Sequence, residues 1–124
     1  NQSGSEFIAY CWTEIPGFSS FGGYTGGSSK FIYTGFEPAF VIIKGSSDNA
    51  GYNWVMIDNK RGMGPDDLTN KLYANKASYT NDDQRGGETR IKFTSNGFWF
   101  LDGQAETNDS LRDYVYAAFA AKPL

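Results

Sequence analysis

Residues 89–102 read TRIKFTSNGFWFLD, and this stretch carries the clearest signal for local structure in the chain. Its Asn96-Gly97 pair favours a type I′ hairpin turn, because both central residues of that turn need positive φ. A two-residue turn at this pair places Phe93 opposite Phe100 in an antiparallel hairpin, and directly opposed residues share a face. The core side of the hairpin is therefore predicted to hold Ile91, Phe93, Phe98 and Phe100. The other side is predicted to hold Arg90, Lys92, Thr94, Trp99 and Leu101.

The same alternation of short apolar runs and turn clusters extends over the rest of the chain. Further strands are predicted at residues 7–13, 30–34, 38–44, 53–58, 71–75 and 114–121. Residues 19–29 (SSFGGYTGGSS) are predicted to form a Gly/Ser-rich loop. No stretch has the period of an amphipathic helix. We therefore expect a single all-β domain over residues 1–124, an antiparallel β-sandwich of about seven or eight strands.

The first and last of these strands, residues 7–13 and 114–121, are apolar on both alternating faces. Strands of that kind are covered on both sides, so these two are predicted to lie inside the sheets and near each other. Cys11 lies between Tyr10 and Trp12 and is predicted to be a buried thiol rather than a nucleophile. It is the only cysteine of the chain, which excludes an intrachain disulfide.

Composition narrows the classes of function. The net charge is −3, and the 11 Lys and Arg are scattered among acidic residues, which disfavours nucleic-acid binding. No apolar run approaches the length of a membrane span. The chain has no histidine, so His-dependent triads and the commonest general base are absent. The spacing of the 14 Asp and Glu selects no pair for carboxylate catalysis. We therefore predict that the protein is not an enzyme.

Calcium is the metal whose chemistry best suits the loops, since it prefers oxygen ligands such as those of Asp and Asn. The candidate pairs and triplet are Asp48-Asn49, Asp58-Asn59, Asp66-Asp67 and Asn81-Asp82-Asp83. None of them matches the spacing of an EF-hand loop, and solvated turns explain them better. No cofactor or metal site is therefore predicted.

Several blocks of sequence resemble, in the same order, a module of tailed-phage virion proteins. The module is known from marine and cyanophage tail fibres, where it often lies at or near the C-terminus of a longer fibre. The blocks are FIAYCWTEIPGFSSFGGYTG (7–26), FIYTGFEPAFVIIK (31–44), NWVMIDNKR (53–61), LYAN (72–75), FTSNGFWF (93–100) and YVYAAFAAKP (114–123). The resemblance covers nearly the whole chain. It implies a lectin-like, jelly-roll type β-sandwich in a virion fibre or related surface appendage, assembled as a homotrimer and attached to host-surface glycan. It supplies no binding residues.

Glycan binding needs exposed aromatic rings beside hydrogen-bonding side chains. Trp99 is the main candidate, because the core of its hairpin cannot explain an indole on the outer face. This position is commonly polar or basic in the phage module, so the indole is particular to this chain. The predicted ligand-binding residues are Trp99, Lys92, Arg90, Asp102, Tyr24 and Trp54.

Other roles for these rings stay open. Trp99 could be covered by a neighbouring subunit or by a second sheet, and Trp54 could belong to the core. Phe21 and Tyr24 could pin their glycine-rich loop to the sandwich. At the level of function, the main alternative is a purely structural virion component, either a capsid decoration protein or a trimerisation knob without a ligand of its own. A depolymerase fragment is a weaker alternative.

Overall fold

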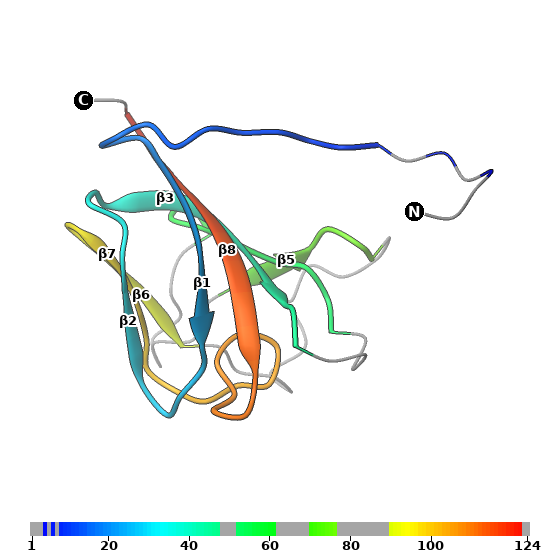
Figure 1. Cartoon of the computed structure of the whole chain (residues 1–124). Coiled ribbons are helices and arrows are strands. Elements are labelled where there is room, and N and C mark those ends of the chain that lie inside the picture. Colours follow the sequence, from blue (N-terminus) through cyan, green and yellow to red (C-terminus); the bar gives the residue numbers. More distant parts are fainter. Residues whose placement is uncertain are drawn as a thin grey trace.

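The computed structural model describes residues 4, 6, 8–47, 52–61, 70–76 and 90–122. Within these residues the protein is all-β, with strands arranged in a five-stranded and a three-stranded antiparallel sheet. The strands are β1 (Ser19–Thr25), β2 (Lys30–Tyr33), β3 (Pro38–Gly45), β4 (Val55–Asp58), β5 (Lys71–Tyr73), β6 (Ile91–Thr94), β7 (Gly97–Phe100) and β8 (Asp113–Ala120). The larger sheet has the order β1-β8-β3-β4-β5 and the smaller one β2-β7-β6 (Figure 1). The predicted antiparallel β-sandwich is confirmed.

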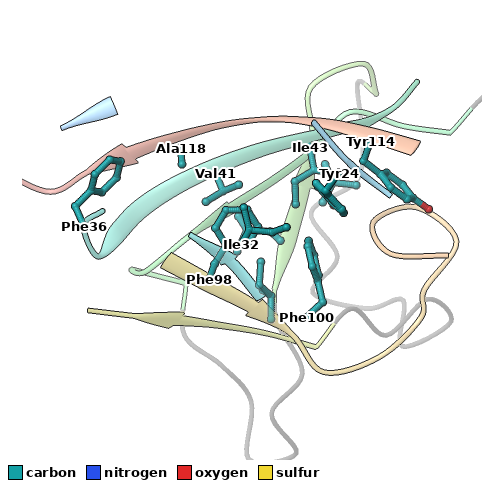
Figure 2. Close-up of a cluster of buried hydrophobic side chains, with 12 residues drawn as sticks. Tyr24, Ile32, Phe36, Val41, Ile43, Phe98, Phe100, Tyr114 and Ala118 are labelled. Atoms are coloured by element: carbon teal, nitrogen blue, oxygen red, sulfur yellow. The ribbon is translucent and has the colours of Figure 1, made fainter. Parts of the chain in front are cut away.

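The core lies between the two sheets and follows from the two-residue period of the strands. In the larger sheet, alternate residues such as Val41 and Ile43 point inward and are fully buried. Phe98 and Phe100 of β7 face them from the smaller sheet, with their ring centroids 5.6 Å apart in an edge-to-face arrangement (Figure 2). Burying a side chain of this size stabilises the fold by about 1.5–3 kcal/mol.

The β6–β7 hairpin exists, but its register differs from the prediction by two residues. Phe93 lies opposite Phe98 rather than Phe100, and the turn consists of Ser95 and Asn96. Because a shift of two residues keeps every side chain on its face, the predicted core side is preserved. Gly97 belongs to β7 rather than to the turn, and its φ is not positive. The turn therefore does not explain why this residue is a glycine. A Cβ at Gly97 would collide with the carbonyl oxygen of Ile32 on β2.

The predictions for the beginning of the chain are wrong. Residues 8–14 form no strand, and the side chains of Ile8, Tyr10 and Trp12 are 82%, 74% and 62% exposed. Cys11 is exposed as well, so it is not a buried thiol. Phe7, the first residue of the predicted strand, lies outside the described residues. The place beside the last strand is taken by β1, within the stretch that was predicted to be a loop.

Two glycines explain how β1 forms from a loop-like sequence. Gly22 lies opposite Tyr116 on β8, and a Cβ there would come within 2.9 Å of the tyrosine ring. Gly23 follows it at an exposed position, and Tyr24 then points into the core. Gly22 thus makes room for the Tyr116 ring of β8, and Gly23 lies against the backbone oxygen of Tyr114, so neither glycine forms a turn. β8 lies between β1 and β3, which confirms that the last strand is interior.

Candidate functional site

The outer face of the three-stranded sheet brings several aromatic side chains to the surface. Along β2 and β7 the inward residues are Ile32, Phe98 and Phe100, so the residues between them point outward. Phe31, Tyr33 and Trp99 are 38%, 68% and 45% exposed, and we call these three rings the platform. The strand register aligns Phe31, Trp99 and Lys92 in one row across the sheet.

The platform is continuous because a glycine lies under it. Phe31 and Trp99 pack edge to face with ring centroids 6.1 Å apart. A Cβ at Gly97 would come within 2.8 Å of Cζ of Phe31, so the Phe31 ring lies over the bare backbone at that position. Gly97 also pairs directly with Tyr33 across the strands. The missing side chain therefore allows β2 to approach closely and leaves room for the aromatic ring.

The indole of Trp99 is held in a fixed orientation by a serine that the sequence analysis did not identify. Its Nε1 donates a hydrogen bond to Oγ of Ser29, 2.8 Å away. The Ser29 hydroxyl in turn donates to the backbone oxygen of Phe100 at 3.2 Å. A ring bonded through its one polar atom presents an apolar plane that need not reorient when a ligand binds. The platform is therefore pre-organised around Trp99.

The predicted polar partners of Trp99 lie near the same hairpin but in different roles. Lys92 is the cross-strand neighbour of Trp99 and lies at the edge of the platform. The backbone N–H of Arg90 donates to Oδ2 of Asp102 at 3.0 Å, and its carbonyl accepts a bond from the Leu101 N–H at 2.8 Å. These contacts close the open end of the hairpin.

Asp102 is better placed to support the hairpin than to bind a ligand. Its Oδ1 atom is buried and has no hydrogen-bond partner among the described residues. Burial raises the pKa of its carboxyl group, although the backbone N–H of Arg90 acts in the opposite direction. An unsatisfied, buried carboxylate oxygen is disfavoured, and protonation relieves that cost.

The other two predicted rings do not join this surface. Tyr24 is buried in the core, where its ring stacks on Tyr114 at a centroid distance of 5.2 Å and its hydroxyl donates to the carbonyl of Thr107. Burial also raises the pKa of the Tyr24 hydroxyl strongly. Trp54 is 46% exposed, but it precedes β4 in the larger sheet. The structure thus brings Trp99, Lys92, Arg90 and Asp102 together and separates Tyr24 and Trp54 from them.

An open pocket of about 440 Å³ lies next to the Tyr33 end of the platform. Gly35 and Ser95 line it on the side of the platform, and a Cβ on Gly35 would lie 3.7 Å from the Tyr33 hydroxyl. Its polar side chains belong to Glu37, Asn59, Ser95 and Lys122. The pocket therefore adds hydrogen-bonding groups of both charges beside the aromatic rings.

A second polar cluster lies inside the fold, around Glu106. One carboxylate oxygen of Glu106 accepts from Nζ of Lys71 and from the hydroxyl of Tyr73, both at 2.7 Å. The other accepts from Nδ2 of Asn53 at 2.9 Å. Burial alone would raise the pKa of Glu106, but the hydrogen bonds and the charge of Lys71 lower it on balance. With both oxygens engaged, the carboxylate ties the segment between β7 and β8 to the larger sheet.

The described residues contain no group of three or more His, Cys, Asp or Glu side chains arranged to hold a metal ion. Of the candidate calcium positions only Asp58-Asn59 lies within them. The carboxylate of Asp58 accepts a 2.6 Å bond from Nε of Arg61 and bonds from two backbone N–H groups. The other candidate positions lie outside the described residues. In the same part of the chain, no helix has the length and apolarity to cross a membrane.

Comparison with known proteins gives one family. A family model described as a domain of unknown function (DUF7483) matches residues 1–123. The curated proteins and the solved structures contain no significant match to the chain.

Proposed function

We propose that this chain, which belongs to the family of the domain of unknown function DUF7483, is a non-catalytic receptor-recognition module that binds glycan through the platform. Its proposed place is a phage tail fibre or related virion appendage, as the sequence resemblance implies, with the module present as a homotrimer. The proposal is one of reversible binding without covalent chemistry. The absence of histidine from the sequence supports that part of it.

The observation that carries the proposal is the fixed, half-exposed indole of Trp99. A sugar ring combines apolar C–H faces with a rim of hydroxyl groups, so it matches an aromatic plane bordered by donors and acceptors. The Trp99 N–H is already bonded to Ser29, which leaves the plane of the ring as its contact surface. Lys92 lies beside it, and the pocket near Tyr33 adds Glu37 and Lys122. The rings supply contact area and the polar groups supply orientation.

The test is a binding measurement on two matched tryptophan variants. Trp99→Ala removes an indole that is 45% exposed, and Trp54→Ala removes one that is 46% exposed outside the platform. An array of bacterial surface polysaccharides first identifies a ligand for the unmodified protein, and calorimetric titration with a soluble oligosaccharide from it then compares the variants. We expect Trp99→Ala to weaken binding about tenfold or more, and Trp54→Ala to leave it unchanged.

Two results would overturn the proposal. The unmodified protein could bind no polysaccharide on the array, or the two variants could bind the oligosaccharide equally well. Thermal melting of each variant is the control for folding, because a loss of binding counts only when the variant is still fully folded at the temperature of the titration.

The structural alternative has an observation of its own in the larger sheet. The middle of the outer face of that sheet is apolar, and its charged residues Lys44 and Asp58 lie near the ends of β3 and β4. Such a face suits contact with protein more than contact with sugar. A virion component that assembles through this face and binds no ligand would keep its mass in solution when Trp99 is replaced.

A further inference from the structure

Two apolar surfaces stay partly exposed within the part of the chain that the structure describes. The first is the segment before β1, residues 8–13, which we call the arm. Its side chains Ile8, Tyr10 and Trp12 are 82%, 74% and 62% exposed. Figure 1 shows the arm in dark blue, running past the sandwich without joining either sheet. A segment that is apolar on both alternating faces is disfavoured in water and suits a covered position.

The second surface is the outer face of the five-stranded sheet. Alternation along β1, β3 and β8 places Phe21, Phe40, Ile42 and Phe119 on the side away from the core, and Met56 follows from β4. We call these five residues the outer apolar face. Phe119 contacts Phe21 and Phe40 at centroid distances of 5.7 and 6.3 Å. All five are only partly buried, although four of them belong to β8, β3 and β4, the three middle strands of the sheet.

The arm reaches the edge of this face in its own copy but does not cover it. The ring of Trp12 stacks on Phe21 at a centroid distance of 6.3 Å, and Tyr10 stacks on Trp12 at 6.1 Å. Phe21 belongs to β1, the edge strand. The row of rings therefore begins on the sheet and continues along the arm.

Hydrogen bonds at the root of the arm fix the direction in which it leaves the sheet. The Ser19 hydroxyl donates to the carbonyl of Thr13 at 3.0 Å and accepts from the Ile15 N–H at 3.1 Å. The carboxylate of Glu14 accepts a bond from the Phe21 N–H at 3.1 Å. Gly17, with a φ of 76°, makes the turn between the arm and β1. These bonds hold residues 13–15 beside β1, and the chain before them runs past the sandwich (Figure 1).

We propose that the arm of one copy packs on the outer apolar face of a second copy of this chain. The chain supplies both matching surfaces, and the anchored root directs the arm away from its own sheet. The exposed parts of Ile8, Tyr10 and Trp12 amount to roughly 400 Å². Each copy would bury its own arm together with the face that receives the partner's arm. The total approaches the roughly 800 Å² per partner that is usual in stable interfaces.

The first test is the mass of the whole chain in solution as a function of concentration, by sedimentation equilibrium. We expect reversible self-association, and we expect Trp12→Ala to weaken it about thirtyfold or more, as aromatic anchors of interfaces do. The matched control is Leu111→Ala, which removes an apolar side chain that is 90% exposed and belongs to neither surface. Its dissociation constant should equal that of the unmodified chain. A monomeric mass at high micromolar concentration, or equal weakening by both variants, overturns the proposal.

The second test uses Cys11, which is exposed in the arm and is the only cysteine of the chain. Ala117 on β8 lies opposite Phe21 and Ile42 and shares the outer side of the sheet with them. Cys11 lies on the side of the arm opposite Tyr10 and Trp12, so a flexible bismaleimide cross-linker, rather than a direct disulfide, should join it to the new thiol of the Ala117→Cys variant in another copy and give a covalent oligomer on a denaturing gel. The Leu111→Cys variant should not, although its thiol is more accessible.

Two further outcomes decide against the proposal in the cross-linking test. A monomer with both thiols consumed means that the arm packs on its own sheet. An oligomer that persists in a Cys11→Ser, Ala117→Cys variant means that the two sheet faces meet directly without the arm. Neither result depends on glycan binding, so this proposal and the proposed function fail separately.

Discussion

The two sheets of this sandwich have outer faces of different character, and the difference indicates what each can bind. On the three-stranded sheet, Trp99 has a polar partner in Ser29 and a charged neighbour in Lys92. On the five-stranded sheet, Phe119 has aromatic neighbours on both sides, Phe21 and Phe40. Both faces expose aromatic rings. Rings with a polar border suit a hydrated ligand, whereas rings among rings suit burial against protein.

The same difference separates two exposed tryptophans. The N–H of Trp99 is bonded to Ser29, which fixes the ring on the sheet, whereas the Trp12 ring stacks between Tyr10 and Phe21 on the arm. The Trp99 ring is therefore already oriented for a ligand. The Trp12 ring belongs to a row of aromatic side chains that is exposed to solvent. Exposure alone does not distinguish them, and the contacts of each ring do.

The largest expected effect tests whether both faces belong to one cooperative unit. Glu106 joins the segment between β7 and β8 to Lys71, whose side chain is 1% exposed. Glu106→Ala removes the carboxylate that lies 2.7 Å from that buried ammonium, which should lower the free energy of unfolding by about 3–5 kcal/mol. Denaturation followed by tryptophan fluorescence and by circular dichroism should give one transition, shifted equally for both signals. Separate transitions would mean that the two faces can be lost independently.

The cost of Glu106→Ala should depend on pH, with a definite sign. The pKa of Glu106 lies below its ordinary value of 4.5, so the folded state favours the ionised carboxylate. The stability that this group contributes is therefore complete above the unfolded pKa and is lost as the pH falls through the folded pKa. The difference in unfolding free energy between the variant and the unmodified protein should be largest near neutral pH and shrink below about 4.5. A difference that stays constant with pH contradicts the ionic role of Glu106.

The sequence predicted which face of a sheet each side chain occupies better than it predicted which residues lie opposite each other on paired strands. The two-residue period assigned Phe98 and Phe100 to the core and Trp99 to the surface even though the hairpin register was shifted. An even shift preserves faces, and the period carries no information on which strands pair. Gly97 was attributed to the turn because Asn-Gly is a local signal, whereas the close approach of β2 depends on residues far away in the sequence.

Polar contacts between residues far apart in the sequence could not be predicted either, because a local pattern carries no information on which distant residues meet. Lys71 and Glu106 are separated by 35 positions, and no periodic pattern links them. Ser29 lies 70 positions from Trp99. The exposed rings of β2 could have been predicted from the sequence. Alternation in residues 30–33 (KFIY) places Phe31 and Tyr33 on one face once Ile32 is assigned to the core. The arm was assigned to the interior because its apolar residues fit a central strand, and that character now supports the proposal that a second copy covers it.

A smaller effect should distinguish two glycines, one from each sheet. Gly97→Ala forces a Cβ against the carbonyl oxygen of Ile32 and into the Phe31 ring, so β2 and β7 must separate. We expect a loss of about 1–3 kcal/mol in the free energy of unfolding, as overpacking usually causes. Gly23→Ala on β1 is the matched control, because its Cβ would meet only the carbonyl oxygen of Tyr114, at 3.3 Å. Equal losses in chemical denaturation would contradict the close approach of β2 to Gly97.

The smallest expected effect is on the stability of the isolated monomer when each exposed tryptophan is replaced. Trp99→Ala removes a half-buried ring and its hydrogen bond to Ser29, which should cost about 1 kcal/mol. Trp12→Ala removes a ring of the arm and should change the free energy of unfolding by less than about 0.5 kcal/mol. Both are measured by chemical denaturation at a concentration where the chain is monomeric.

A loss of about 3 kcal/mol or more for Trp99→Ala would class that ring with the core residues and remove the platform as a binding surface. A comparable loss for Trp12→Ala would mean that the arm already packs on its own domain. Either result would erase the contrast between the two outer faces, because it would show that one of them is covered within a single copy.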